Sequence, residues 1–197
     1  MVIASHLVFT AYGFWLPNDP RGSWSDFVGA WELLKFGKAT RTCERDSTAD
    51  RFHDREARLA AKEALKYPAV RFAGIQARAI GRGFAALVGK CALTIRACSI
   101  LPEHVHMVVM RHAYEAEKIV NLLKGEATRE LVREGIHPMA GYASPGRRPP
   151  KAWARGHWKV FLDTPEDVAR AVEYVAGNPG KEGLPPQLWS FVTPMEA

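Results

Sequence analysis

Two short β-prone runs separated by only two residues constrain the fold of this chain more than any other feature of its sequence. The runs are 93–101 (LTIRACSIL) and 104–110 (HVHMVVM), with Pro102-Glu103 between them. β-Branched and apolar residues at this density favour strands, and so short a connection joins strands that are antiparallel neighbours. We therefore expect a hairpin within an antiparallel sheet.

The flanking segments alternate between strand and helix patterns. Further strands are predicted at 6–13 and 158–162. Helical spacing predicts helices over 55–67 and 113–134, and a less regular helical stretch, interrupted by glycines, over 72–88. The order of these elements predicts an α+β fold in which helices pack on an antiparallel sheet.

The last predicted helix has clear boundary signals. Thr164 offers an N-cap hydroxyl, and Pro165 takes the first helical position with two acids directly after it. Because proline lacks a backbone N–H, Pro179-Gly180 is expected to stop this helix at about Asn178.

The composition suits one folded domain over residues 1–197. Apolar residues make up 47% of the chain, and its three cysteines have no spacing typical of disulfide frameworks or zinc sites. Two segments are too rich in turn residues for regular structure: a Pro/Gly/Trp-rich excursion at about 14–54 and a basic loop at about 141–159. No apolar run is long enough to cross a bilayer, so we expect a cytoplasmic chain without a membrane partner.

The charge balance favours a polyanionic partner. The chain carries a net charge of +6, and basic residues in the loop alternate with aromatic ones, a mixture typical of single-strand binding through phosphate contacts and base stacking. A solvated basic loop explains these charges equally well. The candidate DNA-binding residues are Lys124, Arg129, Arg147, Arg148, Lys151, Arg155, Trp153 and Trp158.

Two histidines in the second strand of the hairpin are candidate metal ligands. Side chains alternate faces along a strand, so His104 and His106 project from the same side, roughly 6–7 Å apart by the rise per residue. Neutral imidazoles at this separation suit a divalent cation, but two ligands bind weakly and a third is needed. The alternative is that both histidines are simply polar residues of a half-exposed strand.

Tyr174 is a candidate nucleophile on the last helix. It lies off the predicted apolar stripe, and Asn178 follows four residues later on the same flank. To attack a phosphate, the phenol must lose a proton whose pKa is ordinarily about 10. The alternative is a tyrosine that packs at the sheet edge with its hydroxyl in water. The stripe consists of Val168, Ala171, Val172 and Val175.

In their order and spacing, these segments resemble the HUH single-strand transposases, and among them the REP-associated tyrosine transposases. The family's "proline, acid, His, hydrophobic, His" strand is similar to LPEHVHMVV, and its lysine-containing helix to IVNLLKGEATREL around Lys124. Its tyrosine helix, followed by "Asn-Pro, basic, Gly-Leu", is similar to EYVAGNPGKEGL. The resemblance covers about residues 94–184.

The resemblance implies a ferredoxin-like sheet of the HUH nuclease type with Mg²⁺ or Mn²⁺ as cofactor. It also implies that Tyr174 cuts single-stranded DNA through a 5′-phosphotyrosine link, and that the DNA has hairpin structure. Asn178 corresponds to a third metal ligand or metal-proximal residue, where other HUH transposases carry Gln or Glu. Whether the chain forms a homodimer stays open.

Two other functions remain as alternatives. The first is a catalytically inactive HUH-fold protein that binds structured single-stranded DNA or RNA as a regulator. The second is a metal phosphohydrolase in which Tyr174 has no chemical role.

Overall fold

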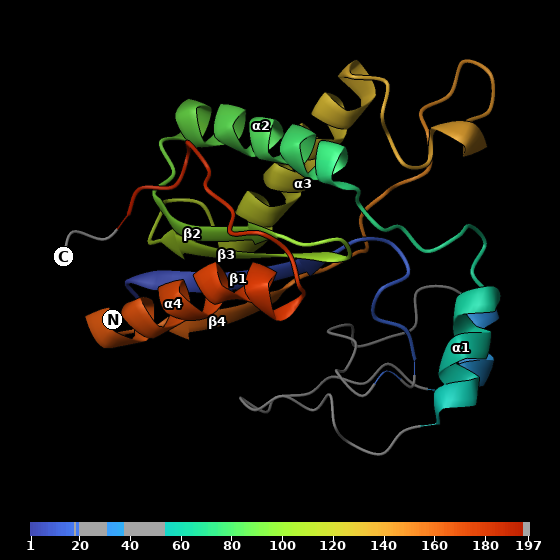
Figure 1. Ribbon diagram of the computed structural model, residues 1–197, viewed down its shortest axis with the longest axis horizontal. Coiled ribbons are helices and arrows are strands. Elements are labelled where there is room, and N and C mark those ends of the chain that lie inside the picture. The colour runs from blue at the N-terminus through green and yellow to red at the C-terminus, as the bar shows by residue number, and fades with distance from the viewer. Residues whose placement is uncertain (18, 20–30, 38–53, 195–197) are drawn as a thin grey trace.

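A four-stranded antiparallel sheet forms the centre of the computed structural model, which describes residues 1–17, 19, 31–37 and 54–194. Its strands are β1 (Ala4–Thr10), β2 (Ile95–Ile100), β3 (His104–Met110) and β4 (Trp158–Leu162), in the spatial order β2-β3-β1-β4 (Figure 1). One of the helices between β1 and β2 packs on the sheet, and so does one between β3 and β4, which gives the ferredoxin-like order of strands and helices. The predicted α+β fold with an antiparallel sheet is confirmed.

Different helices cover the two faces of the sheet (Figure 1). Helices α2 (Gly74–Cys91) and α3 (Ala116–Arg133) pack on one face over the main core, which contains Leu7, Phe9 and Met107. Helix α4 (Pro165–Lys181) packs on the other face over a smaller cluster around Val108. One side of α3, with apolar residues at four-residue spacing, is fully buried: Ile119, Leu123, Ala127 and Leu131 are each at most 4% exposed.

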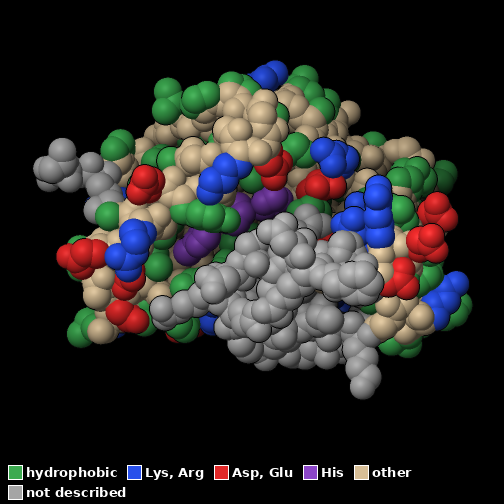
Figure 2. Space-filling model, turned by 60° about the horizontal axis from the view of Figure 1, so that its bottom comes forward, with side chains coloured by type: hydrophobic (Ala, Val, Ile, Leu, Met, Phe, Trp, Pro, Cys, Tyr) green, Lys and Arg blue, Asp and Glu red, His purple; other side chains and the backbone are tan. Residues whose placement is uncertain are grey.

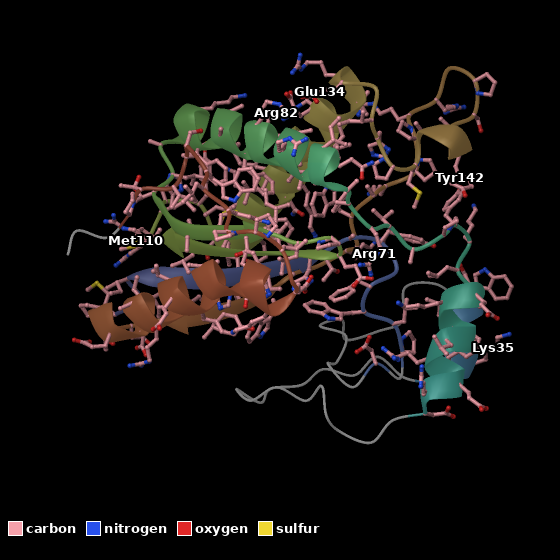
Figure 3. The ribbon with its side chains drawn as sticks, viewed as in Figure 1. Lys35, Arg71, Arg82, Met110, Glu134 and Tyr142 are labelled. Carbon is pink, nitrogen blue, oxygen red and sulfur yellow. The ribbon has the colours of Figure 1, made fainter. Side chains whose placement is uncertain are left out.

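The predicted hairpin is confirmed. Strand β3 has the predicted bounds, β2 lies inside its predicted range, and Ile100 pairs with Val105. The N–H of Leu101 donates to the carbonyl of His104 at 2.8 Å, which closes the turn. Arg71, labelled in Figure 3, forms an ion pair with Glu103 in this turn at 2.9 Å.

The glycines that interrupt the pattern of α2 allow close packing. A Cβ at Gly81 would overlap the ring of Trp189, and one at Gly83 would lie 2.9 Å from the backbone of Ala127 on α3. The helix forms despite their low helical propensity because no larger residue fits at these crossings.

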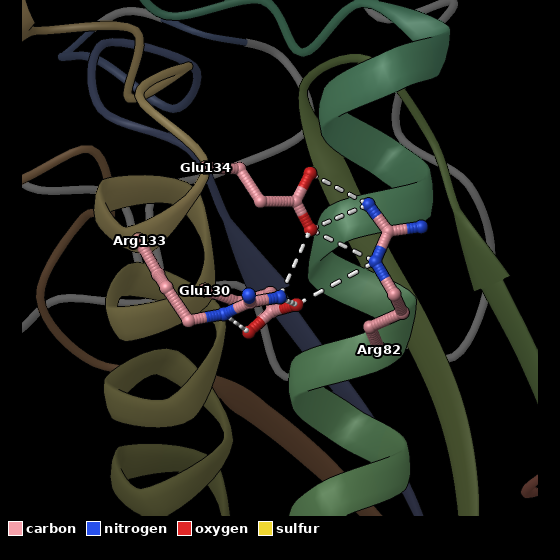
Figure 4. A network of polar contacts seen from close by, with 4 residues as sticks. All are labelled: Arg82, Glu130, Arg133 and Glu134. Carbon is pink, nitrogen blue, oxygen red and sulfur yellow. Dashed lines mark hydrogen bonds and ion pairs between the residues drawn. The ribbon is translucent and has the colours of Figure 1, made fainter.

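Ion pairs join the exposed sides of α2 and α3 (Figure 4). Arg82 on α2 reaches Glu134 at 2.6 Å and Glu130 at 3.5 Å, and Arg133 also pairs with Glu130. Exposed pairs of this kind contribute little individually, so the network mainly sets how the two helices cross.

The C-terminal segment covers the free edge of β2. Gln187 donates to the carbonyl of Ile100 at 2.9 Å and accepts from its N–H at 2.8 Å, and Val192 forms a parallel bridge with Ile95. Exposed strand edges are sites of unwanted pairing, and this segment removes one.

A separate small cluster holds α1 (Arg55–Glu63) and the 3-10 helix η1 (Trp31–Phe36) together through Leu16, Leu33 and Ala61. The described parts of the predicted excursion are residues 14–17, 19, 31–37 and 54, and its remaining residues lie outside the described ranges. The basic loop begins with a second 3-10 helix, η2 (Ala140–Tyr142). No helix in the described ranges is long and apolar enough to cross a membrane.

Several predicted boundaries are wrong by a few residues. Strand β1 begins at Ala4 and ends at Thr10, because it pairs with β3 and β4 from Ala4 onward. Helix α1 ends at Glu63, α2 continues to Cys91, and α3 is shorter than predicted at its start.

The predicted end of α4 is also wrong, for an identifiable reason: the helix continues through Pro179 to Lys181. Proline at this position leaves the carbonyl of Val175 without its helical N–H donor. The hydroxyl of Ser99, on the strand below, donates to that carbonyl instead. A side chain of β2 thus replaces the missing bond and fastens α4 to the sheet.

We predict that Ser99→Ala lowers the free energy of unfolding by about 1–3 kcal/mol, because it leaves a buried carbonyl unpaired. In a Pro179→Ala background the new N–H can donate to the carbonyl of Val175, so Ser99→Ala should lower the free energy of unfolding by less. Urea unfolding of the four proteins of this double-mutant cycle measures the difference. Equal costs in both backgrounds would contradict the explanation.

Candidate active site

The two predicted ligands lie side by side on the face of β3 that α4 covers. The ring centroids of His104 and His106 are 4.9 Å apart, as strand alternation predicts. His106 is 8% exposed, whereas His104 is more accessible. In Figure 2 histidine side chains gather near the centre of one face of the molecule, with acidic and basic side chains around them.

A third imidazole, which sequence reasoning missed, completes this group. His6 on β1 lies on the same face, with its Nε2 3.0 Å from Nδ1 of His106, and it is 7% exposed. Its place depends on the register of β1 against β3, in which His6 is opposite Val108 and Val8 is opposite His106. The signal in the sequence was a histidine directly before the apolar run Leu7–Phe9 of a predicted strand.

Tyr174 meets this histidine group, as the nuclease interpretation requires. Its ring centroid lies 5.7 Å from that of His106 and 5.8 Å from that of His6. The side chain is 47% exposed, so a ligand can reach it. Tyr174 stays outside the apolar stripe because Val168 and Val175 take the buried positions of α4.

Two charged residues at the end of α4 also reach the site. Nζ of Lys181 lies 4.2 Å from the centroid of the Tyr174 ring, and a carboxylate oxygen of Glu182 lies 4.0 Å from Nε2 of His104. Neither was predicted as a site residue. They follow Tyr174 by seven and eight residues, about two helical turns, so helical spacing was the available signal.

Asn178 lies one turn after Tyr174 and is 5% exposed. Among the described residues, its buried Nδ2 has no hydrogen-bond partner. A buried amide with unmet bonding capacity is costly unless a ligand or water completes it.

The predicted excursion contributes to the site. The ring of Phe14 stacks on His104 with centroids 4.9 Å apart and planes 9° from parallel. This contact covers one side of the imidazole and restricts its rotation.

Burial dominates the electrostatics of the site. It lowers the pKa of His6 to about 4, and together with the charges of His104, His6 and Lys181 it holds the pKa of His106 well below its ordinary value. Both imidazoles are therefore neutral at pH 7, the form that ligates metals. Burial also raises the pKa of the Tyr174 phenol, so this group needs help to lose its proton.

The donor set fits a divalent cation in part. His104 and His106 present imidazoles together, and Asn178 and Glu182 bring oxygen atoms, which Mg²⁺ and Mn²⁺ prefer, to the same end of α4. Within the described ranges no three His, Cys, Asp or Glu side chains form a ready metal-binding group. A cation held by these two histidines would therefore take its third ligand from an amide, a shifted carboxylate, water or a bound phosphate.

The predicted DNA-binding residues divide between two surfaces. A groove of about 910 Å³ between α3 and residues 148–156 contains most of them. Trp158 lies instead on the other face of the sheet, where its ring centroid is 5.8 Å from that of His6. Arg147 is exposed and does not line the groove. The basic residues that line the groove are Lys124, Arg129, Arg133, Arg148, Lys151 and Arg155.

Two residues of the groove already have their main contacts within the protein. Nζ of Lys124 donates to the carbonyls of Ala154 and Gly156 at 2.9 and 2.6 Å, and burial lowers its pKa to about 8. Trp153 is 6% exposed and packs between Phe9 and Phe72. Lys124 therefore fastens the basic segment to α3, and Trp153 forms a wall of the groove.

Comparison with known proteins gives similar folds among solved structures. No protein-family model and no curated protein matches the sequence. The chain is similar to a REP-associated tyrosine transposase bound to a REP hairpin, with 13% identity and a TM-score of 0.48, over 96% of this chain and 74% of the other. It is also similar to a protein from Deinococcus radiodurans assigned as a transposase, with 10% identity and a TM-score of 0.40, over 89% of each chain.

We predict that the protein loses stability as the pH falls from about 6.5 to 4. The pKa of His6 is about 4 in the folded protein and about 6.5 when unfolded, so the unfolded state binds more protons in this window. The His6 contribution is on the order of 3 kcal/mol, present above pH 6.5 and lost at pH 4. The free energy of unfolding, measured with urea in the presence of EDTA at several pH values, should fall less steeply with falling pH for His6→Phe than for the wild-type protein. Equal slopes would contradict the prediction.

Proposed function

We propose that this protein is a metal-dependent enzyme that cuts and rejoins single-stranded DNA with Tyr174 as its nucleophile. The observation that carries the proposal is the meeting of one half-exposed phenol with a buried group of neutral imidazoles. A phenol against neutral imidazoles is not required for packing, because the apolar stripe of α4 already holds the helix on the sheet.

The cation would be held by His104 and His106, with Asn178 as the proposed third ligand. When bound, a divalent cation withdraws charge from a phosphate and makes its phosphorus easier to attack. The side chain of Lys181 places a further positive charge beside the Tyr174 ring, where it favours both the phenolate and an approaching phosphate.

In the proposed step, the Tyr174 oxygen forms a bond to phosphorus and the bond from phosphorus to the 3′ oxygen breaks. The phenolic proton passes to solvent or a nearby base, and the departing 3′ oxygen takes up a proton. The product is a 5′-phosphotyrosine link and a free 3′-hydroxyl. Attack by another 3′-hydroxyl reverses the chemistry and rejoins the DNA.

We propose that the basic groove holds the DNA and that residues 151–158 lead it to the site. This segment leaves the groove, pairs beside Thr10 and Ala11 at the end of β1, and then enters β4 at Trp158. Arg148, Lys151 and Arg155 line the groove and form no ion pair with any described residue, so their charges are available to phosphates. Trp158 is then placed to contact a base near the cleaved phosphate.

We predict that the wild-type protein with Mn²⁺ forms a covalent adduct with a hairpin oligonucleotide that carries a single-stranded extension. The adduct should retain a 3′-end label and lose a 5′-end label, because the tyrosine keeps the 5′ phosphate of the downstream fragment. Tyr174→Phe should abolish it, as should His104→Ala. Denaturing gel electrophoresis with each label measures the adduct.

Tyr142→Phe is the matched control, because Tyr142 is as exposed as Tyr174 and lies outside the site. Tight binding without an adduct would contradict the proposal in favour of a catalytically inactive binding protein. Hydrolysis that stops in His104→Ala but continues in Tyr174→Phe would instead indicate a metal phosphohydrolase.

We further predict that Arg148→Ala with Arg155→Ala weakens hairpin binding and reduces its salt dependence. The slope of log K against log salt should fall by about 0.7–0.9 for each lost phosphate contact. Fluorescence anisotropy at several salt concentrations measures the slope. Arg78→Ala, an exposed arginine on α2 outside the groove, is the control. An unchanged slope in the double variant would exclude the groove as the binding surface.

A further inference from the structure

The hydrogen bond between His6 and His106 has no assigned role in the proposed reaction. It joins two buried rings on adjacent strands, with 3.0 Å between Nε2 of His6 and Nδ1 of His106. Burial of two polar rings is costly unless they satisfy each other. A phenylalanine or leucine would fill the space of His6 without that cost, so packing alone does not account for an imidazole at this position.

The bond uses one nitrogen of His106 and leaves the other for a ligand. A neutral imidazole has one N–H and one lone pair, and which nitrogen carries the proton depends on the partner of the other. If His6 donates, Nε2 of His106 carries the proton and cannot bind a cation. If His106 donates from Nδ1, the lone pair of Nε2 is free for a cation.

Packing holds His6 in place for this contact. It lies on β1, which has strands on both sides, and its ring contacts Trp158 on β4 and Tyr174 on α4 edge-on with centroids 5.8 Å away. Three elements therefore fix the ring, and its Nε2 faces His106.

We propose that His6 is a positioning residue that accepts the Nδ1 proton of His106 and so presents Nε2 of His106 to the cation. This inference rests on the proposed cation site. His6 itself does not ligate the cation, because its Nε2 is the acceptor. Metal-ligating histidines commonly donate their second nitrogen in this way, and loss of the acceptor typically weakens metal binding by about 10–100-fold.

The test compares two variants by calorimetric titration with Mn²⁺ in the absence of DNA. His6→Phe keeps an aromatic ring but cannot accept a proton, and it should bind Mn²⁺ about 10–100-fold more weakly. His6→Gln places an amide oxygen near the former Nε2 position, so it should bind close to the wild-type level. Circular dichroism confirms that both variants are folded.

A second measurement needs no variant. Nitrogen-15 NMR of the Mg²⁺-loaded wild-type protein should show His106 with its proton on Nδ1. A proton on Nε2 would overturn the inference even if His6→Phe did not fold.

The remaining outcomes separate this inference from the proposed function. Mn²⁺ binding by the wild-type protein and equally by His6→Phe would overturn the positioning role alone. Equal weakening in His6→Gln and His6→Phe would also overturn it, because the site would then need the imidazole itself. No Mn²⁺ binding by the wild-type protein would overturn the cation site and this inference with it.

Discussion

The register between β1 and β3 is the constraint on which the candidate site depends. It places Val8 opposite His106 and His6 opposite Val108, so the two histidines share one face of adjacent strands. A shift of one residue would turn His6 toward α2 and α3. That shift is prevented because Leu7 and Phe9 are fully buried on that side. The main core thus determines the geometry of the polar group on the opposite face.

The sequence predicted what local patterns determine. Strand alternation gave the pairing of His104 with His106, and the apolar stripe of α4 left Tyr174 outside the buried positions, as observed. The features that the sequence could not predict depend on contacts between residues far apart in the chain. His6 becomes a neighbour of His106 only through strand register, and the carbonyl that Pro179 leaves without a helical donor is satisfied by Ser99 from a distant strand. Likewise, Gly81 is explained by Trp189, 108 residues later.

The basic and aromatic residues of one segment serve different surfaces, which their spacing alone did not reveal. Trp153 and Trp158 are five residues apart, yet the first belongs to the main core and the second contacts His6 on the opposite face of the sheet. Lys124 holds the intervening backbone against α3 through two carbonyls. This contact lies between the charged groove on one face of the sheet and the candidate site on the other.

Anomalous diffraction from crystals soaked in Mn²⁺ would locate the cation without reliance on activity. We expect one strong peak within bonding distance of the rings of His104 and His106, with the hydroxyl of Tyr174 facing it. A peak elsewhere, or none at these histidines under conditions in which Mn²⁺ binds in solution, would contradict it.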